Sequence, residues 1–495
     1  MMRRVSRSGV GTTAGFGLAA FSKDELDTIH YATLQVLKDT GIKVQSENAL
    51  EIFHGGGCDV ERFEGYGIVK FPSYVVEECA FWAPHSIVYA GRNPDDDFVA
   101  EPNRVGFTTF GGCINVIDPV TRKLRRATKK DCGDITRVGD YLDEISVTTR
   151  AVNATDAPAG TISVHNIEAM LSNTGKHIVI GADSPRALNV MAELAAVCAN
   201  GMDNLRKRPI FSVTVCPISP LTLPTNTCDV IIEAAGLGLG ISIIPMALSG
   251  GTSSATLAGT LVTHNAEVLS SIALAQLAKK GLPCTYSSTS TILDLRFGTS
   301  AIGSPEYGMI NAALAKLAQY YRLPSWVGGG PSDSKEPDIQ SGYEFTLSAT
   351  MSALAGASIV FGSGVLEQGL TIDYAKIIMD AEMIRMIQIA IRGMELSDEK
   401  LAMDVIHEVG HGGAYITHEH SLRSMRSQSQ TKLFDRRSRS DWMEATEGKS
   451  IVERAYASAI EILKRHKPYP LPNGAAGEMS NIVKEFEKEV KMAAK

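Results

Sequence analysis

The 495-residue sequence lacks the features of a membrane protein or a nucleic-acid-binding protein. Its longest apolar runs, such as residues 241–248, are far shorter than the roughly 20 residues that a membrane-spanning helix needs. It has 48 Lys and Arg against 55 Asp and Glu, and the resulting charge of −7 gives no positive field to attract nucleic acid or an anionic membrane. With 44% hydrophobic and 21% charged residues, we expect an ordinary globular protein without either partner.

The cysteines form neither a disulfide framework nor a zinc-binding pattern, because no CxxC pair occurs and their spacing is irregular. We therefore expect reduced thiols and a cytoplasmic protein. The chain begins MMRRVSRSG, which resembles the basic start of a signal peptide, but Gly and Thr dilute the apolar part that follows and no cleavage site is evident. We expect no signal peptide. The cysteines are at positions 58, 79, 113, 132, 198, 216, 228 and 284.

Residues 105–370 alternate short, β-branched apolar runs with longer segments of helical pattern. Strands joined by crossovers of a dozen or more residues form parallel sheets, and eight such units close into a (β/α)8 barrel. We therefore predict an α/β protein built on a TIM barrel. The eight predicted strands are residues 105–112, 145–152, 177–181, 210–215, 241–249, 284–291, 325–330 and 358–363, and the crossover helices include 129–142, 185–200, 228–237, 255–280 and 305–321.

Helical extensions flank the predicted barrel. A helix over residues 23–40 begins after Ser22, with Glu25 at the capping-box position. We divide the chain into a mixed, mainly helical N-terminal extension (1–100), a barrel catalytic domain (101–371) and a C-terminal helical extension (372–495). The predicted C-terminal helices cover residues 373–391, 398–409, 451–467 and 481–494.

One short motif matches the HExxH pattern of zinc hydrolases. Zinc binding needs one helix to carry both histidines, yet a glycine lies between them and two more follow, as at a helix end. We interpret the segment as a helix terminus with solvated histidines and predict no metal site, leaving a zinc hydrolase as the alternative. The motif is His407, Glu408, Gly410 and His411, and His418 and His420 are possible further ligands.

Two other patterns have structural interpretations. The glycines at 236, 238 and 240 precede a strand, so they close a helix rather than bind a dinucleotide. A basic stretch has few acids around it, and we interpret it as a solvated face, with an acidic protein or a neighbouring subunit as the alternative partner. It contains Arg423, Arg426, Lys432, Arg436, Arg437 and Arg439.

Aromatic and acidic residues gather at the predicted carboxyl ends of the strands, which is where TIM barrels bind ligands. Ring faces beside carboxylates can hold a quaternary ammonium, which donates no strong hydrogen bond. Each ring could instead belong to the core. The aromatics are Phe110, Tyr286, Trp326, Tyr343, Phe345 and Phe361, and the acids are Asp333, Glu344 and Glu367.

Several strings closely resemble the trimethylamine:corrinoid methyltransferase family over nearly the whole chain. They include residues 29–33 (IHYAT), 216–221 (CPISPL), 246–253 (MALSGGTS), 259–269 (GTLVTHNAEVL) and 303–306 (GSPE). The resemblance implies a (β/α)8 barrel that moves a methyl group from a methylated amine to the cobalt of a corrinoid (cobalamin). That corrinoid is carried by a separate partner protein, so none is expected to be bound tightly to this chain.

The resemblance places Pro331 where the family's archetypes carry pyrrolysine, which is thought to capture or activate trimethylamine. Pro331 has neither an imine nor a titratable group. A quaternary amine needs less help, because its leaving group is a neutral tertiary amine and its positive charge already activates the methyl. Members without pyrrolysine demethylate betaines, and glycine betaine or a related betaine is therefore the expected substrate.

We expect Tyr286, Tyr343, Phe361 and Phe110 to hold the trimethylammonium head, and Asp333 or Glu367 to add charge complementarity. Pro331, Asp333 and Glu367 are the candidate catalytic residues. For a betaine carboxylate, the candidate donors are Arg296, His264 and the backbone N–H groups of Gly250 and Gly251. Two alternatives stay open, namely a non-catalytic quaternary-amine-binding protein and a trimethylamine methyltransferase that works without pyrrolysine. Family analogy and the helical C-terminus also favour a homo-oligomer.

Overall fold

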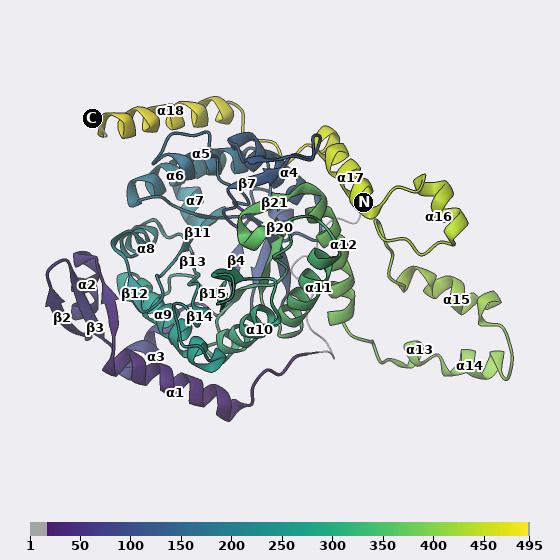
Figure 1. Ribbon diagram of the computed structural model, residues 1–495, viewed down its shortest axis with the longest axis horizontal. Helices are drawn as coiled ribbons and strands as arrows, with labels where there is room; N and C mark the ends of the chain where they lie inside the picture. Colours follow the sequence, from purple (N-terminus) through teal and green to yellow (C-terminus); the bar gives the residue numbers. More distant parts are fainter. Residues whose placement is uncertain (1–16, 494–495) are drawn as a thin grey trace.

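A barrel of eight parallel strands forms the centre of the computed structural model, which describes residues 17–493 apart from the Arg426 side chain (Figure 1). Residues 1–16, which hold most of the stretch weighed as a signal peptide, lie outside the described residues. The predicted TIM barrel is confirmed, and each predicted strand contains one barrel strand. These are β6 (Gly106–Thr109), β9 (Thr148–Thr149), β10 (Ile178–Gly181), β11 (Phe211–Val215), β13 (Ile241–Ile243), β15 (Cys284–Ser288), β18 (Ser325–Gly328) and β19 (Ile359–Ser363).

The barrel is nearly closed. Strands pair in the order β6-β19-β18-β15-β13-β11-β10-β9, so β6 and β9 are the two ends of the sheet. Individual hydrogen bonds, rather than a regular ladder, join these two ends. Ser146 N donates to the Phe107 carbonyl at 2.8 Å, and Thr108 Oγ1 donates to the Val147 carbonyl at 2.8 Å. The gap in the barrel therefore lies between β6 and β9, the first two barrel strands along the chain.

Helices cover the outside of the barrel (Figure 1). The longest, α9, is apolar on almost every side because the barrel packs on one face and helices α1 and α3 pack on another. The covering helices are α4 (Lys129–Tyr141), α5 (Ile162–Leu171), α6 (Pro185–Cys198), α7 (Met202–Lys207), α8 (Thr225–Leu237), α9 (Leu257–Ala278), α10 (Pro305–Tyr320), α11 (Ile339–Leu354) and α12 (Tyr374–Ile391). Helix α8 ends at Gly238 in the left-handed conformation, as the glycine pattern predicts.

The N-terminal elements begin with α1 (Lys23–Asp39), whose predicted capping box is present, since Ser22 N donates to Glu25 Oε2 at 2.8 Å. A small sheet follows in which β1 pairs with β3 and with β12 (Thr222–Leu223), which fixes this extension to the barrel. The remaining elements are β1 (Ile42–Val44), α2 (Glu47–Gly55), β2 (Asp59–Phe63), β3 (Tyr66–Lys70) and α3 (Ser73–Trp82).

A hairpin of β4 (Ile87–Tyr89) and β5 (Phe98–Ala100) packs into the amino-terminal end of the barrel. Tyr89 and Phe98 belong to one buried cluster with Trp326 and Phe361 of the barrel strands. Tyr89 also bonds Thr285 through their hydroxyls at 2.8 Å. The hairpin therefore closes this end and supports the aromatic side chains above it.

Short strands extend the carboxyl ends of the barrel into two small rim sheets. One contains β14 (Leu248–Ser249), β16 (Thr291–Asp294) and β17 (Thr299–Ala301). The other contains β20 (Val365–Leu366), β21 (Thr371–Asp373), β7 (Asn115–Ile117) and β8 (Leu124–Arg126).

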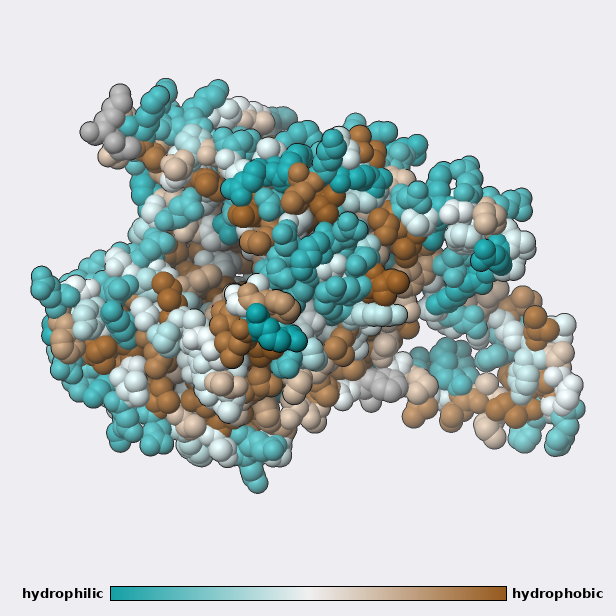
Figure 2. All heavy atoms as spheres, viewed as in Figure 1, coloured by the Kyte–Doolittle hydropathy of each residue, from teal (hydrophilic) through white to brown (hydrophobic). Residues whose placement is uncertain are grey.

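The C-terminal part starts as an arm of short helices that projects from the side of the barrel (Figure 1). The predicted helix 398–409 is wrong as one element, because Ala402 adopts φ 49° and divides it into two. Apolar side chains gather along the arm's surface (Figure 2). The helices are α13 (Asp398–Leu401), α14 (Met403–Val409), α15 (Glu419–Ser424), α16 (Arg439–Thr446), α17 (Ile451–Arg465) and α18 (Ala475–Ala493), of which α17 packs on α12 and α18 on α6. None of the described helices is long and apolar enough to span a bilayer.

Candidate functional site

A cavity of about 300 Å³ opens at the carboxyl ends of the barrel strands. Three aromatic rings, several aliphatic side chains and four threonines form its walls. Among the described residues, Arg150 is the one charged side chain on these walls, and no carboxylate lines them. Ligands of TIM barrels bind at this end, so the cavity is the candidate site.

The aromatic wall consists of Phe110, Trp326 and Phe361. Phe110 follows β6, whereas Trp326 and Phe361 lie in the neighbouring strands β18 and β19. Trp326 and Phe361 are each 3% exposed, and the Phe110 and Phe361 ring centroids are 5.8 Å apart. Trp326 meets Tyr89 of the hairpin edge to face at 6.1 Å. The structure thus brings together three of the rings that the sequence indicated and holds two of them rigidly.

A bulge beside Phe361 brings the loop after β18 close to the site. The pairing of β19 with β6 shifts register between Phe361 and Ser363, and Gly362 has φ +140°. A Cβ at Gly362 would lie 2.5 Å from Pro331 Cδ, so only glycine permits this approach. Pro331 is buried beside Gly362 and does not line the cavity.

The three acids expected at the site hold the rim loops together instead. Glu344 Oε2 accepts hydrogen bonds from Ser332 Oγ at 2.5 Å and Asp333 N at 2.8 Å. Asp333 Oδ1 accepts from Ile302 N at 3.1 Å, and Glu367 Oε2 accepts from Thr371 Oγ1 at 2.6 Å.

None of the three acids lines the cavity. Burial raises the pKa of Asp333 to about 6, and the nearby charge of Glu344 acts in the same direction. The expected charge complementarity from Asp333 or Glu367 is therefore not found on the cavity wall.

Two side chains predicted to bind substrate are buried between the barrel and helix α9 instead. Tyr286 is fully buried between β15 and α9, where its hydroxyl donates to Asn265 Oδ1 at 2.9 Å. His264 lies inside α9 with Nδ1 3.0 Å from Ser290 Oγ, and burial lowers its pKa to about 3. Successive strand residues point to opposite faces, and Tyr286 is on the outward one.

Further predicted residues lie at the surface or in turns. Tyr343 is 74% exposed on the outer face of α11. Arg296 lies in the β16–β17 turn, paired with Asp294 at 2.6 Å. Gly250 and Gly251 form the turn after β14 and are not part of the cavity wall. Phe345, the other rim aromatic, is buried in α11 with Lys376 Nζ 4.9 Å from its ring. The structure separates all of these side chains from the cavity.

Arg150 is the residue that the sequence reasoning missed. It directly follows β9, within the predicted strand 145–152, so its position at a strand end was an available signal. Its Nε is buried and has no hydrogen-bond partner among the described residues. Cys216 lines the same cavity, where its surface is open to the cavity interior but protein atoms surround it closely. This desolvation raises the pKa of its thiol, and the positive charge of Arg150 acts in the opposite direction.

The HExxH segment does not carry both of its histidines on one helix. Helix α14 ends at Val409 and Gly410 caps it, so His411 lies outside the helix, as its glycines predict. His418 instead lies 3.2 Å from Glu408. Within residues 17–493, no group of three or more potential ligands is arranged to hold a metal ion.

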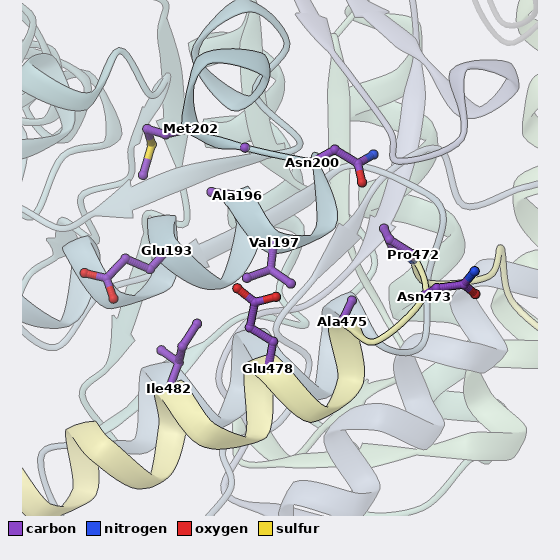
Figure 3. Close-up of a pocket in the computed structure, with 11 residues that line it drawn as sticks. Glu193, Ala196, Val197, Asn200, Met202, Pro472, Asn473, Ala475, Glu478 and Ile482 are labelled. Carbon is purple, nitrogen blue, oxygen red and sulfur yellow. The ribbon is translucent and has the colours of Figure 1, made fainter.

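A second hollow, of about 520 Å³, lies outside the barrel where α18 packs beside α6 (Figure 3). Glu193 and Glu478 approach it from the two helices, and Val197 and Ile482 supply apolar contacts. It shares no lining residue with the rim cavity and has no cluster of reactive groups. We interpret it as a packing groove of the C-terminal helix.

The sequence of the whole chain matches one family model, described as trimethylamine methyltransferase (MTTB), over residues 13–491. The chain belongs to the trimethylamine methyltransferase family. A relative named trimethylamine methyltransferase MttB, from Desulfitobacterium hafniense (strain DSM 10664 / DCB-2), is 47% identical over 99% of both chains. A glycine betaine methyltransferase from Desulfitobacterium hafniense (strain Y51) is 29% identical over 95% of this chain and 97% of that one.

The fold of this family member is similar to that of one solved structure. The monomethylamine methyltransferase MtmB of Methanosarcina barkeri superposes with a TM-score of 0.52 at 15% identity, covering 89% of this chain and 92% of that one. This likeness supports the barrel architecture and, at such low identity, nothing finer.

Proposed function

We propose that this enzyme transfers a methyl group from a quaternary amine, glycine betaine or a related betaine, to the Co(I) of a corrinoid bound to a separate protein. The observation that carries the proposal is the rim cavity with Phe110, Trp326 and Phe361 on its wall. Ring faces attract a methylated ammonium through their quadrupoles, and the attraction is stronger where water is excluded.

The cavity favours a quaternary amine over trimethylamine. Protonated trimethylamine carries an N–H that needs an acceptor, yet no described carboxylate lines the cavity. Pro331 supplies no group that reacts with an amine. The relatives' names include both trimethylamine and glycine betaine, so the substrate has to be argued from the cavity.

The size of the cavity also fits a corrinoid that stays on another protein. A volume of about 300 Å³ accommodates a small amine but not a corrin macrocycle, which would have to remain at the mouth. When present there, Co(I) supplies the nucleophile that accepts the methyl group. The chain's own contribution is to bind the ammonium group, align one methyl with the opening and exclude water.

The test is anaerobic spectroscopy of cob(I)alamin, free and on a corrinoid protein, with the enzyme and glycine betaine, other quaternary amines or trimethylamine. We expect methylcobalamin with a quaternary amine and none with trimethylamine. Turnover of trimethylamine alone would contradict the choice of substrate. Binding of betaine without any methyl transfer would instead identify a non-catalytic binding protein.

We also propose that the enzyme forms a homo-oligomer in the cytoplasm through its arm, residues 393–448. Helices α13, α14 and α15 contain no buried residues, whereas Leu396 and Ile416 are each 83% exposed. Such short helices need packing partners, and permanent apolar interfaces are typical of identical subunits. Light scattering should give a multiple of the 53.1 kDa chain mass, and a monomer would contradict the proposal.

A further inference from the structure

We infer that Arg150 binds the carboxylate of the substrate and thereby makes the cavity selective for zwitterionic methylammonium compounds over simple cations. The inference rests on the proposed function and names the residue that binds the carboxylate of the betaine. It starts from the position of Arg150 directly after β9, on the wall of the aromatic cavity.

The backbone fixes Arg150 and leaves room for its guanidinium group. Arg150 N donates to the Val179 carbonyl at 3.3 Å, and its carbonyl accepts from Gly112 N at 2.8 Å. Gly112 has φ +104°, and a Cβ there would lie 3.1 Å from Arg150 Nη2. Glycine at this position therefore gives the loop its conformation and keeps space beside the charged group.

Arg150 differs in its partners from two other arginines of the chain, Arg125 and Arg385. Arg125 pairs with Asp131 at 2.7 Å, and Arg385 pairs with Glu382 at 2.7 Å. Arg150 has no carboxylate partner among residues 17–493, and its buried Nε makes no hydrogen bond to them. A buried donor without a partner destabilises a fold, so its presence in a cavity indicates a ligand that supplies the acceptor.

The charge of the cavity points to the same class of ligand. Arg150 contributes one positive charge, and no described carboxylate of the wall balances it. A quaternary cation alone would add a second positive charge to a space of about 300 Å³. A betaine instead brings its own carboxylate, which can pair with the guanidinium while its methyl groups contact the rings. A zwitterion can therefore pair with Arg150 and contact the aromatic rings at the same time.

Equilibrium binding to the full-length protein tests the inference without any corrinoid. Isothermal titration would compare glycine betaine, a zwitterion, with tetramethylammonium, a cation without a carboxylate. In Arg150→Met we expect the affinity for glycine betaine to fall about 10- to 100-fold, the range for a lost charge-assisted hydrogen bond. Affinity for tetramethylammonium should stay the same or rise, because a like charge has gone. Arg150→Lys should restore part of the betaine affinity.

Arg296→Met is the matched control, because Arg296 is an exposed arginine outside the cavity and should leave both affinities unchanged. Circular dichroism would confirm that each variant is folded. Equal loss of both ligands in Arg150→Met, or loss of neither, would overturn the inference.

The two proposals fail in distinguishable ways. Methyl transfer from glycine betaine that is undiminished in Arg150→Met would refute the role of Arg150 and leave the proposed reaction intact. Betaine binding that depends on Arg150, without methyl transfer by the wild-type enzyme, would refute the reaction and leave the carboxylate site intact.

Discussion

Two charged regions at the mouth of the barrel differ in how their polar groups are satisfied. The acidic rim, defined as Asp333, Glu344 and Glu367, accepts hydrogen bonds from neighbouring loops at all three carboxylates. Arg150, on the cavity wall, has a buried Nε without a partner in the described chain. Groups that are satisfied internally hold the loops in place, whereas the unsatisfied group is the one available to a ligand.

The largest expected effect comes from breaking a satisfied pair beside the acidic rim. Lys376 Nζ lies 2.7 Å from Asp380 Oδ2, and both side chains are buried. Lys376 Nζ also donates to the Gly330 carbonyl at 3.4 Å. Lys376→Met leaves an unpaired buried carboxylate and should reduce the free energy of unfolding by about 3–5 kcal/mol. Urea unfolding would measure it. The double variant Lys376→Met/Asp380→Leu should recover most of the loss, and an equally unstable double variant would contradict this explanation.

The second largest effect concerns the aromatic wall. Phe361→Ala removes a ring from the cavity and should weaken binding of every quaternary amine about 30-fold, equivalent to about 2 kcal/mol for a desolvated cation–ring contact. The loss should be similar for glycine betaine and tetramethylammonium, unlike that in Arg150→Met. Titration calorimetry would measure both. Tyr343→Ala, an exposed aromatic outside the cavity, is the control, and weakened binding there would show that the site has been misplaced.

A smaller effect is expected from Glu344→Gln. The carboxylate accepts from Ser332 Oγ and Asp333 N, and an amide oxygen replaces it with weaker, uncharged hydrogen bonds. Stability should fall by about 1–2 kcal/mol. Thermal unfolding of the two proteins measures the change. No loss at all would mean that the acidic rim does not hold its loop.

Asp333 should make stability depend on pH. Burial raises its pKa to about 6 from the usual 3.8, so the folded protein holds a proton that the unfolded chain releases at lower pH. This contribution is present below about pH 4 and is lost as pH rises through 6. Asp333→Asn cannot ionise, so its stability relative to wild type should increase between pH 4 and 7. Parallel unfolding curves across this range would refute the shift.

The smallest expected change in stability is that of Arg150→Met, and it distinguishes Arg150 most clearly from the internally paired charges. Arg150→Met removes a charge that has no internal partner, so it should change the free energy of unfolding by less than about 0.5 kcal/mol, or increase it. Urea unfolding beside Lys376→Met would show the contrast directly. A loss of several kcal/mol would mean that Arg150 is structural.

The sequence was sufficient to predict the barrel because its strands are apolar, β-branched runs separated by helical crossovers. It did not determine which strand residues face inward. In β15 both faces are buried, and Thr285 points into the barrel toward Tyr89 while Tyr286 points to the helices. Because all five residues of β15 are buried, its sequence does not show which of them face the barrel interior. Phe110 and Phe361 were predicted because they adjoin strand ends that face the opening.

Other parts of the site depend on contacts between distant segments. The β4–β5 hairpin, which supports Trp326 and Phe361, precedes the first barrel strand, and no local pattern reveals that it fills the barrel. The acids of the rim were expected to face substrate, but Asp333 and Glu344 accept hydrogen bonds from residues of other rim segments. Whether a carboxylate is already satisfied is a property of the folded structure.

The most direct test is a crystal structure of the enzyme with glycine betaine. We predict the ligand in the rim cavity, with its carboxylate about 3 Å from the Arg150 guanidinium and its methyl groups against Phe361 and Trp326. A carboxylate bound elsewhere, or a betaine outside this cavity, would contradict the account.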